Sequence, residues 1–326
     1  MQETSKSTLK ALAPGFSVVV PVYRSAAVLP ELVARIDPVL KSLGQPFELV
    51  LVNDGSPDNS WQVIEKLASA HQWVRGIALM RNFGQHNALL CGIRNARHEI
   101  VVTIDDDLQH PPEEIVKLLA KLGEGYDVVY GTPQEEQHGM WRNLASQLTK
   151  LSLKSTMGVD VARNVSAFRV FRTELRGAFA NYQSPFVSID VLLTWATTRI
   201  AAVQVQHDPR KIGTSNYTVG KLVRYAFNMI TSFSVLPLQI ASLVGFLFTL
   251  FGALVLFYVV GRYLVTGTSV PGFPFLASII AIFSGAQLFA LGIIGEYLAR
   301  VHFRTMDKPP YAVRESEQSN RQISHI

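Results

Sequence analysis

Two long apolar segments, residues 238–263 and 273–298, constrain the fold of this chain more than any other feature of its sequence. Each is long enough to cross the hydrocarbon layer of a bilayer, about 30 Å thick, as an α-helix. Because a chain in lipid must satisfy its own backbone hydrogen bonds, helices are the expected structure. Basic residues flank the pair: Lys221, Arg224, Arg300, His302, Arg304 and Lys308. These flanks predict a cytoplasmic position for both ends of the pair, with residues 264–272 as a short external loop.

The stretches around the two segments complete a multi-pass organisation with both termini in the cytoplasm. Residues 218–237 carry apolar side chains at helical intervals with polar ones opposite, which predicts an amphipathic helix in the membrane interface. Residues 299–326 are expected to be a basic cytoplasmic tail, disordered after Pro310. Residues 1–14 contain no continuous apolar run, so we expect a flexible tail and not a signal peptide.

Composition narrows the class of partner. The chain has 326 residues, of which 48% are hydrophobic and 17% charged, with a formal net charge of +5. No compact basic stripe with interleaved aromatic residues is present, which disfavours nucleic acid as a partner. Anionic lipid and a phosphate-bearing substrate account for the charge better. The single cysteine, Cys91, excludes an intramolecular disulfide and fits the reducing cytosol.

Residues 15–217 alternate apolar strands with amphipathic helices. The expected strands cover residues 16–23, 47–52, 74–80, 100–104 and 126–131, with shorter ones at 168–171 and 200–205. The expected helices cover residues 28–43, 85–96, 113–122 and 190–197, with another from Trp61. This order predicts an α/β domain with a mostly parallel sheet covered on both faces. Ligands of such sheets bind at the carboxyl ends of the strands.

Three carboxylates, Asp105, Asp106 and Asp107, follow the strand at residues 100–104. If strand geometry continues, Asp105 and Asp107 point to one face and Asp106 to the other. Two carboxylates held this close repel one another unless a cation lies between them, and Mg²⁺ or Mn²⁺ suits such oxygen ligands. The alternative is helix capping, but a cap requires one Asp. We therefore interpret Asp105 and Asp107 as metal ligands and expect Asp106→Ala to be the mildest of the three substitutions.

Other motifs narrow the choice of enzyme class. Asp54 also follows a predicted strand, so it is expected near Asp105 and Asp107. No G-x-G-x-x-G follows the first strand and no Walker lysine motif is present, which disfavours dinucleotide oxidoreductases and P-loop enzymes. Residues 210–217 form a polar loop with a glycine and two cations, which is compatible with phosphate binding or with an ordinary turn before a helix.

With these motifs the chain resembles a family 2 glycosyltransferase of the polyprenyl-phosphate type. That group includes bacterial enzymes that load glucose or 4-deoxy-4-formamido-L-arabinose onto undecaprenyl phosphate and, more distantly, dolichyl-phosphate mannose synthase. The resemblance extends from Val18 to about Pro310. Its specific pieces are residues 52–56, 81–86, 105–113, 166–169, 210–217 and 295–297.

The resemblance implies a GT-A catalytic domain that transfers a sugar, with inversion, from a nucleotide sugar to undecaprenyl phosphate at the cytoplasmic face of a bacterial inner membrane. A UDP-linked donor, Mg²⁺ or Mn²⁺ as cofactor and a homo-oligomer, a tetramer, are implied in the same way. So is a role in modifying lipopolysaccharide, lipid A or another envelope glycan.

The resemblance also implies roles for individual residues. The donor nucleotide sugar would contact Pro21, Tyr23, Asp54, Arg81 and Asp105. Asp105 and Asp107 would hold the metal. The phosphates of donor or acceptor would contact Arg169, Arg210, Lys211, Ser215 and Tyr217. The catalytic set would be Asp105, Asp107, Arg169 and Asp160.

The sequence departs from its relatives at three places. Several relatives carry an acidic residue where this chain has residues 165–167, and Asp160 is the nearest carboxylate here. Many have Asn-Glu where this chain has Arg24 and Ser25, and one has lysine in place of Asn216. The missing acid is tolerable because a phosphate monoester, with a second pKa near about 6, is already an anionic nucleophile at neutral pH.

Two alternatives stay open. A processive polysaccharide synthase would need more membrane helices and a Q-x-x-R-W motif, which the sequence lacks. A membrane-anchored protein that binds nucleotide sugars or presents lipid without turnover would not need the intact carboxylate pair.

Overall fold

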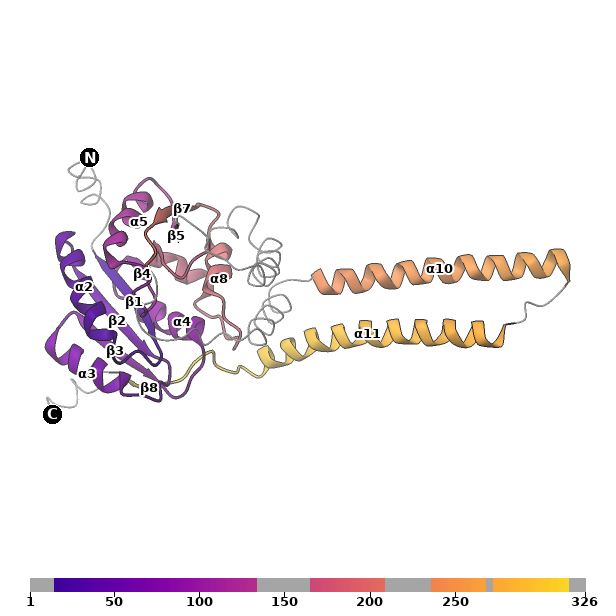
Figure 1. The fold of residues 1–326 in the computed structure, drawn as a ribbon, viewed down its shortest axis with the longest axis horizontal. Helices are drawn as coiled ribbons and strands as arrows, with labels where there is room; N and C mark the ends of the chain where they lie inside the picture. Colours follow the sequence, from indigo (N-terminus) through magenta and orange to yellow (C-terminus); the bar gives the residue numbers. More distant parts are fainter. Residues whose placement is uncertain (1–14, 134–164, 209–235, 268–271, 317–326) are drawn as a thin grey trace.

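The structure is a computed structural model, and it describes residues 15–133, 165–208, 236–267 and 272–316. A sheet of eight described strands in the order β7-β5-β6-β4-β1-β2-β3-β8 forms the centre of the α/β domain (Figure 1). The strands are β1 (Phe16–Val22), β2 (Phe47–Asn53), β3 (Val74–Leu79), β4 (Ile100–Thr103), β5 (Val128–Pro133), β6 (Arg169–Arg172), β7 (Ile200–Val205) and β8 (Val313–Ser316). Among these, β6 and β8 run antiparallel to their neighbours and the other pairs are parallel. The prediction of a mostly parallel sheet is confirmed.

Helices cover both faces of this sheet. The described helices of the domain are α2 (Leu29–Ser42), α3 (Ser60–Ala70), α4 (Gln85–Asn95), η1 (Pro112–Glu114), α5 (Ile115–Leu122), η2 (Thr173–Phe179) and α8 (Ile189–Ala196). Val18 and Val20 of β1 belong to the core beneath α2, α3 and α5, whereas Val19 belongs to the core beneath α4, η2 and α8. Alternate residues of one apolar strand therefore enter opposite cores, which is why the central strands are apolar at nearly every position.

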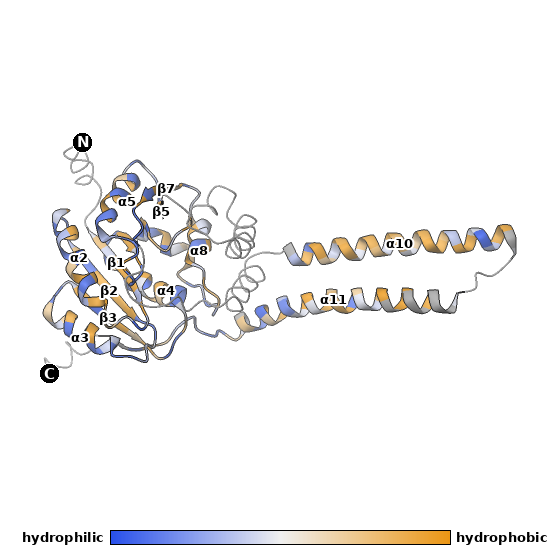
Figure 2. Ribbon diagram, in the orientation of Figure 1, coloured by the Kyte–Doolittle hydropathy of each residue, from blue (hydrophilic) through white to orange (hydrophobic). Residues whose placement is uncertain are grey.

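Two long helices, α10 (Leu236–Thr266) and α11 (Phe273–Thr305), lie side by side and project from the domain (Figure 1). Phe248 and Phe283 pack edge to face between them, with ring centroids 5.5 Å apart. Pro237–Val265 and Ile282–Phe303 are long and apolar enough to cross a membrane. Hydrophobic residues occupy much of both helices (Figure 2), and many of their large apolar side chains are exposed and not buried in a core. A pair of helices that faces lipid requires such exposed apolar side chains, whereas a water-soluble protein would not tolerate them.

One prediction about the C-terminal region is wrong. Residues 310–316 are not a disordered tail, because β8 pairs antiparallel with β3, with Ile77 opposite Ser316 and Leu79 opposite Val313. The edge of β3 offers unpaired backbone N–H and C=O groups, and β8 satisfies them. The predicted interfacial helix lies outside the described residues except for its last two, which belong to α10. α11 extends to Thr305, seven residues beyond the predicted end.

Candidate active site

The carboxyl ends of four parallel strands meet at one edge of the sheet. β1, β2, β3 and β4 run side by side in the same direction, and polar segments follow each of them. These segments are residues 23–25, 54–56, 80–84 and 105–107. The structure therefore brings these polar segments together, because parallel strands place their carboxyl ends side by side.

The D-x-D pair lies in a turn and not in an extended strand. β4 ends at Thr103, and Leu108 has a φ of 57°. The alternation expected of a strand therefore does not set the side-chain directions of Asp105 and Asp107. The amide Nε2 of Gln85 donates to Oδ1 of Asp105 at 2.6 Å, and the backbone N–H of Gln109 donates to Oδ1 of Asp107 at 3.1 Å.

The carboxylate oxygens of Asp105 and Asp107 suit a divalent cation that also binds substrate. Both carboxylates are partly exposed. The described residues contain no group of three or more His, Cys, Asp or Glu side chains that could enclose an ion. Mg²⁺ and Mn²⁺ accept one or two carboxylates and complete their coordination with water and substrate phosphate. Asp105 and Asp107 therefore fit an ion shared with a diphosphate better than an ion enclosed by protein.

The Asp106 carboxylate connects the turn after β4 to the turn after β1. Its Oδ2 accepts a hydrogen bond from the Ser25 hydroxyl and another, at 3.3 Å, from the backbone N–H of Tyr23. Burial raises the pKa of Asp106 to about 6; the bonds from Ser25 and Tyr23 oppose the rise, and Asp107 adds to it. The expectation that Asp106→Ala is the mildest substitution is therefore revised.

The turn after β1 is fixed by several hydrogen bonds at once. The N–H of Arg24 donates to Ser56 Oγ at 2.6 Å, and the N–H of Ser25 donates to Ser60 Oγ at 3.1 Å. These bonds hold Arg24 at a φ of 59°, a left-handed conformation that is uncommon for a residue other than glycine. Backbone held in this way is frequent at binding sites.

Two predicted donor contacts lie on this edge. Tyr23 is 38% exposed, and the guanidinium of Arg24 lies 5.4 Å from its ring centroid. Arg81 is exposed after β3 and lies 4.3 Å from the ring centroid of Phe83. Pro21 is buried within β1. Tyr23 and Arg81 thus present side chains at the site, and Pro21 presents at most its backbone.

Asp54 binds the chain itself. Its carboxylate accepts the backbone N–H groups of Phe83 and Gly84 at 2.7 and 2.8 Å, and the residue is 2% exposed. Burial raises the pKa of Asp54 above its usual value, against the N–H bonds and the charge of Arg81. Asp54 therefore shapes residues 81–84, and its contact with a nucleotide stays a prediction.

Arg169 is buried behind the D-x-D turn. It is 1% exposed, its Nη1 group donates to Oδ1 of Asp190, and its Nε donates to Thr103 Oγ1 at 3.0 Å. The Tyr130 hydroxyl donates to the same Asp190 oxygen at 3.2 Å. Because this ion pair is enclosed, a direct phosphate contact by Arg169 would require the pair to open. That contact stays a prediction.

Two histidines stand near these groups and were not predicted. Nδ1 of His86 accepts the N–H of Ile189 at 3.3 Å, and burial lowers the pKa of His86 to about 4, opposed by Asp190 and reinforced by Arg169. His110 stacks on Phe168 at 5.2 Å, and burial, followed by the charge of His207, lowers its pKa to about 4. Both imidazoles are therefore neutral at neutral pH.

Comparison with known proteins decides the family. Residues 17–178 match the family described as Glycosyl transferase family 2. A protein of Shewanella sediminis named undecaprenyl-phosphate 4-deoxy-4-formamido-L-arabinose transferase is 36% identical over 302 residues, which cover 92% of this chain and 91% of the relative. The chain belongs to glycosyl transferase family 2. A Pseudomonas aeruginosa relative of this glycosyltransferase, with the same name, is 34% identical and covers 91% of the chain and 88% of its own length.

Solved structures support the fold of this glycosyltransferase. Glucosyl-3-phosphoglycerate synthase from Mycobacterium tuberculosis, solved with Mn²⁺, UDP and phosphoglyceric acid, superposes with a TM-score of 0.53 at 20% identity. The match covers 71% of this chain and 80% of that one. At this identity the likeness concerns the fold, which is of the GT-A type predicted from the sequence.

Several predicted site residues of the glycosyltransferase lie outside the described residues: Asp160, Arg210, Lys211, Ser215 and Tyr217. Asp190 and Asp106, in contrast, are described and were not predicted as site residues. A lone Asp in the apolar run of α8 was the available signal for Asp190, because a buried carboxylate needs a partner.

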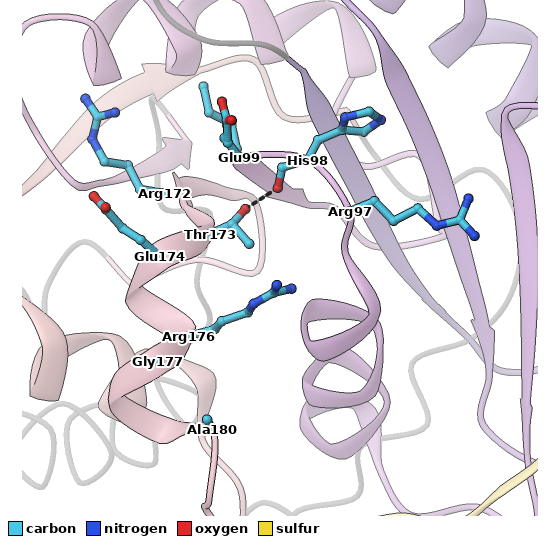
Figure 3. Close-up of a pocket in the computed structure, with 10 residues that line it drawn as sticks. Arg97, His98, Glu99, Arg172, Thr173, Glu174, Arg176, Gly177 and Ala180 are labelled. Atoms are coloured by element: carbon cyan, nitrogen blue, oxygen red, sulfur yellow. Dashed lines mark hydrogen bonds between the residues drawn. The ribbon is translucent and has the colours of Figure 1, made fainter.

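A cavity of about 740 Å³ lies near the amino end of β4, opposite to the end that carries the D-x-D pair (Figure 3). It adjoins Ile100, the first residue of β4, whereas Asp105 follows the last. Its lining mixes arginines, a histidine and carboxylates: Arg97, His98, Glu99, Arg172, Glu174 and Arg176. Thr173 Oγ1 donates to the His98 carbonyl across it at 2.6 Å. The cavity is separate from the D-x-D edge, and we assign it no part in sugar transfer.

Proposed function

We propose that this glycosyltransferase moves a sugar from a nucleotide sugar to undecaprenyl phosphate at the cytoplasmic face of a bacterial inner membrane. The observation that carries the proposal is that the partly exposed pair Asp105 and Asp107 belongs to a chain with two long, exposed apolar helices. The relatives named as undecaprenyl-phosphate transferases support the acceptor. Modification of lipopolysaccharide or another envelope glycan follows from that acceptor.

The donor is proposed to be UDP-linked. The solved neighbours that hold UDP and Mn²⁺ on the same fold support this choice. Tyr23 and Arg81 would contact the nucleotide, and Asp105 and Asp107 would hold Mg²⁺ or Mn²⁺ with the diphosphate. When bound, the ion supplies Lewis-acid stabilisation of the charge that develops on the leaving diphosphate.

The reaction is an inverting displacement. A phosphate oxygen of the acceptor forms a bond to the anomeric carbon while the bond from that carbon to the diphosphate breaks, and the nucleoside diphosphate leaves. The acceptor phosphate is already anionic at neutral pH, so no side chain has to remove a proton. Asp160 as a member of the catalytic set without a required role as base, the phosphate contacts of residues 210–217 and a homo-oligomer, a tetramer by resemblance, remain parts of this proposal.

A donor panel tests the proposal. The purified full chain in vesicles with undecaprenyl phosphate and Mg²⁺ or Mn²⁺ is given radiolabelled UDP-4-deoxy-4-formamido-L-arabinose, UDP-glucose or GDP-mannose. We expect one UDP-sugar to label the lipid. Retention of label in the nucleotide fraction with every donor would leave a binding or lipid-presenting role as the better account.

A further inference from the structure

The chain segment that follows the second apolar helix is attached to the active-site edge. We call residues 310–316 the C-terminal strap. The backbone N–H of Met80 donates to the Ala312 carbonyl at 2.9 Å, and the Arg314 guanidinium donates to the Met80 carbonyl at 3.0 Å. Met80 directly precedes residues 81–84. The strap therefore engages both polar backbone groups at the start of that segment.

The segment held by the strap leads to the D-x-D pair. Phe83 and Gly84 donate their N–H groups to Asp54, and the next residue, Gln85, donates to Asp105 at 2.6 Å. Residues 80–85 thus run from the strap to a carboxylate of the donor site. A shift at Met80 would reach Asp105 through a short, hydrogen-bonded stretch.

Asn87 ties the strap to this stretch from the side of α4. Its Nδ2 donates to the carbonyls of Pro310 at 2.5 Å and Pro185 at 3.2 Å, and the residue is 6% exposed. Both partners are acceptors, so the amide nitrogen must face them. Asn87 lies in the first turn of α4, two residues after Gln85. One buried amide therefore joins the strap, the loop at Pro185 and the helix that carries Gln85.

α11 is connected to both segments that carry the acceptors of Asn87. Residues 306–309 separate the end of α11 from Pro310. The Arg300 guanidinium of α11 lies 4.7 Å from the ring centroid of Phe186, the neighbour of Pro185. The position of α11 is thus linked to Asn87 through two separate segments.

We propose that Asn87 is a positioning residue, which fixes the C-terminal strap against residues 80–85 and so holds Asp105 in its donor-binding geometry. The inference rests on the proposed function, because it assigns a role within the same donor site. The alternative is that the strap simply covers the edge of β3. If the strap only covered this edge, loosening it would lower the free energy of unfolding. It would not change KM for the donor and KM for the acceptor by different factors.

The test compares variants of the full chain in vesicles. Asn87→Ala is the main variant and Arg314→Ala a second one. Asn95→Ala is the matched control, because the side-chain amide of Asn95 lies on the same helix and donates to the Cys91 carbonyl within it at 2.9 Å.

We expect Asn87→Ala to raise KM for the UDP-sugar about tenfold and Arg314→Ala to raise it less. Both should change KM for undecaprenyl phosphate by less than about twofold. Asn95→Ala should stay within about twofold for both substrates. Equal changes in both KM values, no change, or an equal loss in Asn95→Ala would overturn the proposal.

Amide hydrogen exchange supplies a readout that needs no turnover. Asn87→Ala should speed exchange in residues 80–88 and leave residues 115–122 of α5 unchanged. If the wild-type chain transfers no sugar from any donor, the proposed function fails while this readout still decides the positioning role. Faster exchange in residues 80–88 with residues 115–122 unchanged would support the role, and unchanged exchange in residues 80–88 would overturn it.

Discussion

The hydroxyl group of Ser25 donates a hydrogen bond to Oδ2 of Asp106 and so ties the turn after β1 to the turn after β4. Tyr23 donates its backbone N–H to the same oxygen at 3.3 Å. The middle residue of the D-x-D motif therefore holds the turn that presents Tyr23. This contact joins two parts of the proposed donor site that are far apart in the sequence.

Asp106→Ala should be a damaging substitution. It removes the acceptor of the Tyr23 N–H and one of two acceptors of the Ser25 hydroxyl, which also bonds to the Tyr23 carbonyl at 3.1 Å, at a cost of about 1 kcal/mol in the free energy of unfolding. KM for the UDP-sugar should rise because the Tyr23 turn loosens. Thermal unfolding in detergent and donor kinetics measure the two effects. Ser25→Ala should reproduce part of both, and the double variant should fall short of additivity. Full additivity would mean that the two residues do not act through this bond.

Asp190→Ala should destabilise the domain strongly. It leaves the buried guanidinium of Arg169 without its carboxylate, and breaking a buried ion pair in this way costs about 3–5 kcal/mol. The control is Glu124→Ala, which removes the partner of Lys121 in a more exposed pair and should cost far less than Asp190→Ala. Denaturant unfolding followed by fluorescence compares them. Similar losses in the two variants would contradict the buried pair.

Gly55→Ala should disrupt the site. Gly55 has a φ of 59°, and a Cβ there would lie 2.3 Å from the carbonyl carbon of Arg81 and 2.5 Å from the nitrogen of Asn82. Gly44 has a φ of 65° with nothing within 4 Å, so Gly44→Ala carries the backbone strain alone, roughly 1–2 kcal/mol. We expect Gly55→Ala to lower kcat/KM for the donor by about tenfold or more and Gly44→Ala to leave it nearly unchanged. Equal activities would show that residues 81–84 need not stay in place.

Glu48 should make stability depend on pH in the acid range. Burial alone would raise the pKa of this carboxyl, but hydrogen bonds from Ser17 and the Arg97 N–H, with the Arg75 ion pair, hold it below 4.5. A carboxyl whose folded pKa is depressed stabilises the fold above its unfolded pKa, about 4.3, and loses this contribution as pH falls through the folded value.

The measurement is the unfolding temperature of wild type and Glu48→Gln in detergent. The gap between them should shrink between about pH 7 and about pH 3. Glu174 is exposed, so the unfolding temperature of Glu174→Gln should differ little from that of wild type at either pH. A gap for Glu48→Gln that is constant with pH would exclude this carboxylate as a source of acid sensitivity.

The central strands and the position of the candidate site could be predicted because their determinants are local. β1 and β2 are buried on both faces and therefore read as continuous apolar runs, and each is followed by polar residues. β8 was not predicted, because its four residues are ordered by pairing with the edge of β3, which is distant in the sequence. The roles of Asp106 and Asp190 escaped for the same reason. Their partners, Ser25 and Arg169, lie in other elements, and the sequence does not show which elements meet.

The most direct test of the account is the transfer of radiolabelled sugar to undecaprenyl phosphate by wild type and by Asp107→Asn in the same vesicles, with Mg²⁺ or Mn²⁺ and with a chelator. Asp107→Asn keeps the size of the side chain and removes the charge that would hold the ion. The account predicts metal-dependent labelling of the lipid by wild type, and loss of at least about 100-fold in Asp107→Asn with membrane insertion and unfolding temperature unchanged. Labelling by Asp107→Asn at the wild-type rate, or labelling by wild type that the chelator does not reduce, would contradict it.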